Sequence, residues 1–247
     1  MNRADISNEK MKKLNIKNNS LSKYFDEFED IKNKLIYGEV WQQGNMDDKL
    51  RAIVTVAVLI TVEGRDLEEQ LNVALSVGVK PEELLEIFHQ SAPYIGFPKV
   101  EKSLEILKKV FKERNISMPL EHNGVVTEED RLKEGIEVQK SIFGEVIDKM
   151  RSSASGSEKV MQDYLSAYCF GDTYTRKGLD LKIRELITFV CISALGGCDA
   201  QVRAHVGGNI SVGNSKELLI SVVYQILPYI GFPRSLNAIA AINDIAK

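Results

Sequence analysis

A six-residue segment that occurs twice constrains this chain more than any other feature. The sequence PYIGFP stands at Pro93–Pro98 and again at Pro228–Pro233, 135 residues apart. Upstream the two halves stay collinear, and the spacing becomes 133 in the pairs Gly38 and Gly171, Asp47 and Asp180, Arg51 and Arg184, and Thr55 and Thr188. Self-similarity at a fixed period is the signature of a repeated structural unit. The chain is therefore predicted to be a tandem duplication, with two extra residues in the second copy near Gly196-Gly197.

Both copies have the periodicity of helices. Segment 182–195 places apolar residues at 183, 186, 187, 190, 191 and 194, which is the spacing of an α-helix and not the alternation of a strand. Its counterpart, 52–62, is a continuous apolar run whose β-branched residues also permit a strand, and the second copy decides for a helix. A long amphipathic helix, interrupted at Gly144, is predicted over 128–150. The predicted fold class is all-α.

The domain organisation follows from the duplication. Residues 1–20 are rich in Lys and Asn and are predicted to form a loose N-terminal arm. The first repeat is assigned to 21–112 and the second to 128–247. Residues 113–127, ERNISMPLEHNGVVT, carry polar and turn-forming side chains and are predicted to be the linker.

Composition excludes several classes of protein. With 44% hydrophobic and 27% charged residues among 247, the chain is not disordered, and its net charge of −3 is too balanced for a general nucleic-acid binder. No apolar run approaches the roughly 20 residues of a membrane-spanning helix, and the N-terminus lacks the apolar core of a secretory signal. The three cysteines have no metal-ligand spacing, and no nucleotide-binding glycine pattern occurs. A cytoplasmic protein without metal, cofactor, nucleic-acid or membrane partner is expected.

Two long segments carry a resemblance to a known family. GEVWQQGNMDDKLRAIVTVAVL and GDTYTRKGLDLKIRELITFVCISAL are each followed by a helix, a glycine and YIGFP, and KSIFGEV precedes the second. Together they resemble the carboxymuconolactone decarboxylase-like family, which shares its fold with the alkylhydroperoxidase D-like proteins. The resemblance covers roughly 22–112 and 130–247. It implies a tandem pair of alkylhydroperoxidase D-like helical domains and, because such proteins form rings of six domains, a homotrimer.

The resemblance also implies a candidate site in the second repeat. In the hydroperoxidase branch, a Glu on one helix is followed by C-x-x-C-x-x-x-H on the next, and this chain offers Glu185, then Cys198 and His205, with Gln201 where the second Cys belongs. These positions mark Cys198, His205 and Glu185 as catalytic candidates, and Gln201, Arg184 and Tyr229 as substrate-binding ones. The matching positions of the first copy, Glu63, Asp66 and Gln70, have neither Cys nor His, which predicts a catalytically silent copy.

Each candidate also has a purely structural interpretation. A thiol at a helix N-terminus meets favourable backbone dipoles that lower its pKa, but Cys198 would equally serve as a small buried hydrophobe. His205 follows it by seven residues, about 10 Å along a helix, which is too far for a direct hydrogen bond. Glu185 would orient the imidazole of His205 or remain a first-turn acid. Arg184 would bind an anionic substrate or form an ion pair at the repeat or subunit interface.

Three functions stay open at this point. In a thiol-dependent peroxidase of the peroxiredoxin type, Cys198 attacks a peroxide, becomes a sulfenic acid, and is restored by an external thiol reductant. Because Gln201 cannot act as a resolving thiol, an intramolecular dithiol cycle is excluded. In a carboxy-lyase acting on a lactone carboxylic acid such as carboxymuconolactone, His205 is the general acid and base and an arginine holds the carboxylate. The third is a non-catalytic oligomeric binding protein. The peroxidase is favoured, because Cys198 and His205 hold two of the three diagnostic positions.

Overall fold

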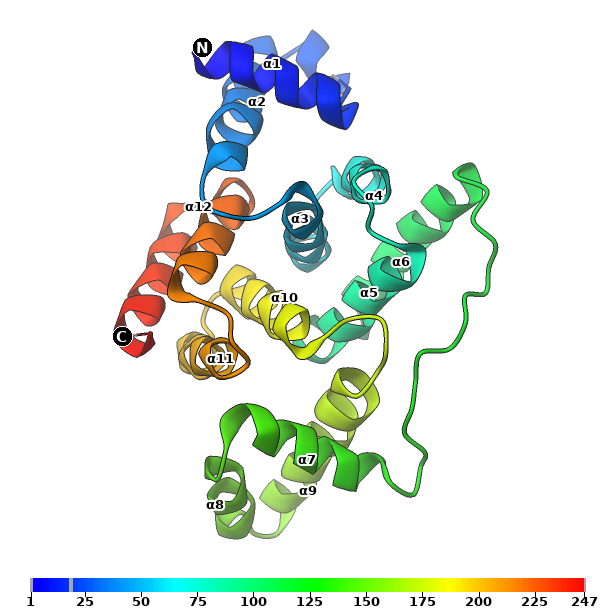
Figure 1. The fold of residues 1–247 in the computed structure, drawn as a ribbon, viewed down its shortest axis with the longest axis vertical. Coiled ribbons are helices and arrows are strands. Elements are labelled where there is room, and N and C mark those ends of the chain that lie inside the picture. Colours follow the sequence, from blue (N-terminus) through cyan, green and yellow to red (C-terminus); the bar gives the residue numbers. More distant parts are fainter. Residues whose placement is uncertain (1, 18–19, 247) are drawn as a thin grey trace.

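In the computed structural model, which describes residues 2–17 and 20–246, the chain folds into helices joined by short connections and one long linker (Figure 1). The described residues contain no strand, which confirms the all-α class. The first repeat comprises α1 (Arg3–Leu14), η1 (Ser20–Lys23), α2 (Asp26–Asn33), η2 (Lys34–Glu39), η3 (Val40–Gln42), α3 (Asp48–Val62), α4 (Leu67–Ser76), α5 (Pro81–Ile95) and α6 (Phe97–Glu113). The second comprises α7 (Arg131–Phe143), α8 (Val146–Ser153), α9 (Ser157–Tyr164), η4 (Leu165–Tyr174), α10 (Leu181–Leu195), α11 (Asp199–Ser211) and α12 (Lys216–Ile245). Within the described residues, no helix is long and apolar enough to cross a bilayer.

Helix ends in the two repeats are set by equivalent residues. The side chain of Asp47 accepts a hydrogen bond from the backbone N–H of Leu50 at 2.7 Å and caps α3, and Asp180 caps α10 in the same way. Gly96 separates α5 from α6 at φ 82°, and Gly231 breaks α12 at φ 74°. Glycine adopts this left-handed region without steric cost, which explains why it lies at the same place in both copies.

The segments η2 and η4 have the wide turn of a π-helix, which the apolar periodicity did not predict. They occupy equivalent positions in the two repeats, η2 before η3 and α3, and η4 before α10. Short π-helical segments occur frequently at functional sites, and η4 supplies several side chains of the site described below.

The N-terminal segment is not the loose arm that its composition predicted. Residues Arg3–Leu14 form α1, whose N-terminus is capped by the side chain of Asn2 and whose Leu14 is buried against η2. A Cβ atom on Gly38 would clash with the carbonyl oxygen of Arg3, so the two backbones touch. Lys and Asn misled the prediction because they occupy the exposed side of α1. Residues 1, 18 and 19 of the predicted arm lie outside the described part.

The helix α7 packs on η4 as α1 packs on η2. A Cβ atom on Gly171 would clash with the carbonyl oxygen of Arg131, and Arg131 pairs with Asp172 as Arg3 pairs with Glu39. The helix α1 therefore packs on the first repeat in the way that α7 packs on the second.

One hydrophobic core spans both repeats. The helices α3 and α10 lie side by side near the centre of the molecule (Figure 1), and apolar side chains from both repeats form a single buried cluster around them. The linker runs from α6 to α7 along one side. The two copies therefore share a core.

A buried polar contact joins the second repeat to the first. The side-chain oxygen of Gln90 on α5 accepts a hydrogen bond from Arg184 at 3.1 Å, and its amide nitrogen donates to Thr188 at 3.0 Å. Both partners lie on α10, and all three side chains are buried.

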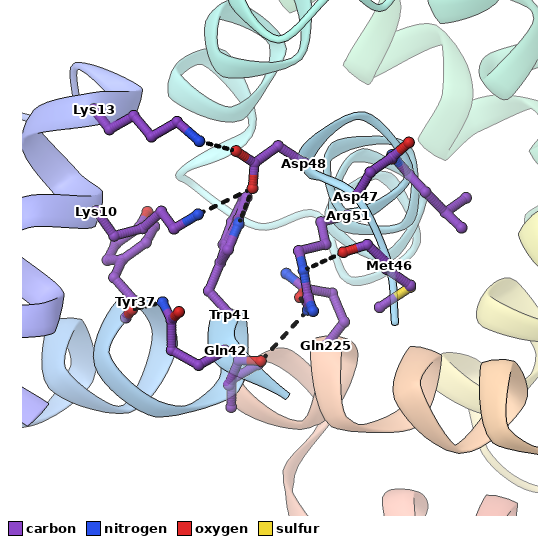
Figure 2. Close-up of polar contacts among 12 residues, drawn as sticks. Lys10, Lys13, Tyr37, Trp41, Gln42, Met46, Asp47, Asp48, Arg51 and Gln225 are labelled. Atoms are coloured by element: carbon purple, nitrogen blue, oxygen red, sulfur yellow. Dashed lines mark hydrogen bonds and ion pairs between the residues drawn. The ribbon is translucent and has the colours of Figure 1, made fainter. Parts of the chain in front are cut away.

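The same contact exists in the opposite direction. Gln225 on α12 accepts from Arg51 at 2.9 Å and donates to Thr55 at 3.0 Å, and both partners lie on α3 (Figure 2). Each repeat thus inserts one glutamine into the other, as expected if the duplicated units exchange equivalent surfaces.

We expect Gln225→Ala to lower the free energy of unfolding by about 1–3 kcal/mol, because buried polar groups of Arg51 and Thr55 lose a partner. Urea denaturation followed by circular dichroism measures this change, and Gln90→Ala should have a similar effect. The control is Gln43→Ala, whose side chain is exposed. A loss below about 0.5 kcal/mol, typical of surface substitutions, would contradict the structural role of the pair.

Candidate functional site

The second repeat brings a carboxylate and an imidazole together in its interior. Glu185 on α10 is fully buried, and its Oε2 lies 2.9 Å from Nδ1 of His205 on α11. Its Oε1 accepts a hydrogen bond from the hydroxyl of Tyr174 at 2.7 Å. The amide of Asn209 donates to the backbone carbonyls of Glu185 and His205, which holds the two helices at this separation. Two of the three catalytic candidates therefore form a hydrogen-bonded pair.

The surroundings of His205 determine which ring nitrogen is free. Nδ1 faces a carboxylate oxygen of Glu185 and donates a hydrogen bond to it, so Nε2 is the ring nitrogen left for a ligand. The rings of Phe143 and Tyr94 meet the imidazole edge-on, with centroid distances of 5.3 and 5.7 Å, and fix its plane. Nε2 has no hydrogen-bond partner among residues 2–17 and 20–246. It is thus available to a bound molecule.

A chain of hydroxyl groups links Glu185 to the first repeat. The hydroxyl of Tyr174 lies 2.8 Å from Oγ1 of Thr188 and 3.0 Å from the hydroxyl of Tyr94, which comes from α5. Burial, and then the nearby Glu185 charge, raises the pKa of Tyr174 well above its usual value, so this hydroxyl stays protonated. The site is therefore assembled across the boundary between the repeats.

His205 opens into a cavity of about 600 Å³, which is the size of a small-molecule site. The cavity lies between α5, α7, α8, α9, η4 and α11, and its polar lining consists of Tyr94, Gln139, Tyr168, Gln201 and His205. The remaining lining is mostly apolar, including Phe143, Val146, Ile147, Met150, Met161 and Phe170, and contains no Lys or Arg. The hydroxyl of Tyr168 is buried without a hydrogen-bond partner in the described part of the chain, and burial raises its pKa to about 12. This hydroxyl is a free donor for a ligand.

Cys198 lies elsewhere. It is the N-cap of α11 and faces a separate cavity of about 20 Å³, where its thiol donates to the carbonyl of Gly196 at 3.4 Å. Cys198 and His205 therefore line different cavities. The physical reason is that two helical turns separate them along α11, so Cys198 meets α12 near Arg234. Cys169 does line the larger cavity, but burial raises its pKa to about 12, so it is a protonated thiol.

The three predicted substrate-binding residues separate as well. Gln201 lines the cavity of His205. Arg184 does not, because it is fully buried and donates to Glu86 at 2.9 Å and to Gln90, so its predicted substrate role is wrong and the alternative of an ion pair between repeats holds. Tyr229 is the counterpart of Tyr94 at the other end of the duplication and packs near Trp41, away from the cavity.

The first repeat has no equivalent pair. Ala52 replaces Glu185, and Gln70 replaces His205 and donates to the hydroxyl of Tyr37 at 3.0 Å. Trp41 replaces Tyr174, is buried, and donates to Asp48 (Figure 2). The carboxylate of Asp48 also accepts from Lys10 and Lys13 of α1 at 3.0 and 2.7 Å. The first repeat therefore has neither the carboxylate nor the imidazole of the dyad, and its catalytic silence stays a prediction.

Sequence reasoning missed Tyr174 and Tyr168 as site residues. The repeat itself carries a signal for Tyr174, since it pairs with Trp41, the one tryptophan in the chain. Within the described residues, no group of three or more His, Cys, Asp or Glu side chains lies close enough to hold a metal ion.

Comparison with known proteins identifies the family of the chain. The profile of the Carboxymuconolactone decarboxylase family matches residues 26–109 and again 160–244. The chain belongs to this family. Two matches, one in each repeat, identify this family member as the two-copy form.

Individual proteins agree with the family assignment. The family member is 27% identical to the 4-carboxymuconolactone decarboxylase of Acinetobacter baylyi over 123 residues, which cover 49% of this chain and 91% of the relative. It is 31% identical over 83 residues to an uncharacterized 15.0 kDa protein of Paracoccus denitrificans, covering 32% of this chain and 61% of that protein. A putative gamma-carboxymuconolactone decarboxylase subunit from Burkholderia xenovorans has the same fold at a TM-score of 0.60 and 16% identity, over 96% of this chain and 95% of that one.

We expect iodoacetamide at pH 8 to label Cys198 in the folded protein and to leave Cys169 and Cys191 unlabelled. The raised pKa values of the two buried thiols leave almost no thiolate at that pH, whereas Cys198 is partly exposed. Peptide mapping by mass spectrometry identifies the modified residue, and urea-denatured protein, in which all three react, is the control. Rapid labelling of Cys169 would show that the cavity holds a reactive thiol.

Proposed function

We propose that the second repeat is a carboxy-lyase site that removes carbon dioxide from a small lactone carboxylic acid such as 4-carboxymuconolactone. The observation that carries the proposal is the pair Glu185 and His205, with the imidazole lining a cavity that contains no thiolate. The Acinetobacter baylyi relative bears this activity in its name, which favours the same reaction class here.

The chemistry needs an electron acceptor and a proton. As the bond to the carboxyl carbon breaks, its electron pair passes to the conjugated carbonyl of the substrate, carbon dioxide leaves, and His205 delivers a proton to carbon. The protonated imidazole is stabilised by Glu185, and solvent restores the proton after release of the product. Donors such as Tyr168 and Gln201 would hold the carbonyl oxygen where negative charge develops.

The apolar lining suits a decarboxylation. The arginine expected for the carboxylate does not line the cavity, so the carboxylate would lie against apolar side chains. A localised charge is poorly solvated there, whereas the transition state spreads that charge into the substrate, and the barrier falls by the difference. The site gives less support to a peroxidase that uses Cys198. The thiol faces a cavity of about 20 Å³, which is too small for a substrate, and His205 does not line that cavity.

We expect His205→Ala to lower kcat for carbon dioxide release from 4-carboxymuconolactone by about 10²–10⁴-fold, the range for loss of a general acid-base group. Glu185→Gln should lower kcat more than it changes KM, because it removes the charge that stabilises the imidazolium. Cys198→Ser is the matched control and should leave turnover unchanged.

The opposite pattern is equally informative. If the wild-type protein turns over peroxide with an external thiol, and this activity is lost in Cys198→Ser but kept in His205→Ala, the cysteine mechanism is correct. Absence of carbon dioxide release from the wild-type protein at millimolar substrate would contradict the proposed substrate.

We further propose that the chain assembles into a homotrimer. Exposed apolar side chains occur in pairs at equivalent positions of the two repeats, as expected if both repeats take matching places in a ring: Phe28 with Met161, Ile31 with Tyr164, and Phe97 with Phe232. Met161 and Tyr164 also line the cavity of His205, so association over this face would cover its mouth.

Light scattering coupled to size-exclusion chromatography should give the mass of three chains. Met161→Asp should reduce the measured mass, because it places a charge on the face that the proposed trimer would bury, and burying that charge opposes association. Val125→Asp, at an exposed apolar residue of the linker, is the control and should leave the trimer intact. A monomeric wild-type protein at micromolar concentration would disprove the assembly.

A further inference from the structure

A second cavity, of about 660 Å³, lies in the first repeat between α5, α6 and the linker. Its apolar wall is formed by Leu85, Leu104, Leu107, Phe111, Met118 and Leu120. It shares no lining residue with the cavity of His205. Its volume lies in the range of small-molecule sites, and nothing in the proposed lyase reaction uses it.

The linker is fixed where it closes this cavity. Residues 118–122 line the cavity, and the next residue, Asn123, donates from its side chain to Glu86 at 3.2 Å. The carbonyl of Asn123 also accepts from the backbone N–H of Lys177 at 3.0 Å. The wall formed by the linker is therefore held in place by two long-range hydrogen bonds.

Behind the cavity lies a cluster with excess positive charge. The buried carboxylate of Glu86 accepts hydrogen bonds from Arg176 at 2.9–3.1 Å and from Arg184 at 2.9 Å. Two guanidinium groups share one carboxylate, and Gln90, the other side-chain partner of Arg184, is neutral. Arg176 lines the cavity with 16% of its side chain exposed. Because Arg176 shares the Glu86 carboxylate with Arg184, the positive charge there is only partly balanced, which favours an anion beside it.

Two imidazoles face the same space. His89 is half-buried and His122 is exposed, both line the cavity, and neither has a hydrogen-bond partner among the described residues. Of the acidic side chains on the cavity, Glu105 pairs with Lys108 at 2.9 Å. Glu121 is exposed, so water screens its charge.

We propose that this cavity binds a small amphipathic monoanion. Its apolar body would lie against the leucine-rich wall, and its carboxylate would accept hydrogen bonds from His89 and His122 and face Arg176. The linker between the repeats thus acts as one wall of a binding site. This site is independent of the lyase activity, since it uses none of the same residues.

Three probes with one eight-carbon chain and different head groups test the proposal on the full-length protein. In isothermal titration calorimetry, octanoate should bind at least about tenfold more tightly than 1-octanol or octylammonium, because only its head makes charge-assisted hydrogen bonds. Equal affinity for the three probes, or no heat from octanoate at millimolar concentration, would overturn the proposal without any variant.

Two substitutions locate the site. Leu104→Trp fills the second cavity and should weaken octanoate binding at least about tenfold, as should His89→Leu, which removes one hydrogen bond to the charged head. Ala204→Trp fills the cavity of His205 instead and is the matched control, with octanoate binding unchanged. Loss of binding in Ala204→Trp and its persistence in Leu104→Trp would assign octanoate to the other cavity and refute this one. Carbon dioxide release tests the lyase proposal at the His205 cavity, and octanoate binding tests the proposal for the second cavity. Each proposal can therefore be contradicted without affecting the other.

Discussion

The reciprocal insertion of a glutamine between the repeats is the contact on which the rest of the structure depends. Gln90 is buried between Arg184 and Thr188, and its amide has to meet both, because an unpaired polar group in a core costs more than the bond contributes. The register of α5 against α10 is therefore fixed. That register places Tyr94 beside Tyr174 and hence beside Glu185. The hydroxyl chain beside the dyad is therefore completed by a residue of the first repeat.

The two halves of the molecule differ in the polar groups that they bury at equivalent positions. In the second repeat, the buried Glu185 is stabilised by donors from Tyr174 and His205. In the first repeat, Ala52 stands at the position of that carboxylate, so no buried charge has to be stabilised there. The buried rings of Trp41 and Tyr37 pack against each other in this repeat. The shared core is unaffected, since the contacts between repeats use other residues.

Much of the fold could be predicted from the sequence, because helices show a local periodicity of apolar residues. The duplication also allows each assignment to be compared between the two copies. The pairing of Glu185 with His205 was also accessible, since both positions belong to a known helix-to-helix pattern. The linear spacing of Cys198 and His205 was misleading, because the N-cap residue turns toward α12 and leaves the face that His205 occupies. Contacts between residues far apart in the sequence could not be predicted either. Nothing in the sequence near Arg184 indicated that Glu86 and Gln90 of the other repeat would accept its hydrogen bonds. The helix α1 was missed because its polar composition hid one buried edge.

The two arginines at the centre of the glutamine contacts also show where the molecule departs from its own symmetry. Arg51 is satisfied by Gln225 and by backbone carbonyls such as those of Met46 and Gln43 (Figure 2), since the residue equivalent to Glu86 is Ser221. Around Arg184 the carboxylate of Glu86 is present, but a second guanidinium, Arg176, comes with it, where the first half has Gln43. A single carboxylate would have balanced Arg184 alone. The added arginine leaves one positive charge over, on a side chain that lines the linker cavity, so the departure from symmetry gives that cavity its cationic wall.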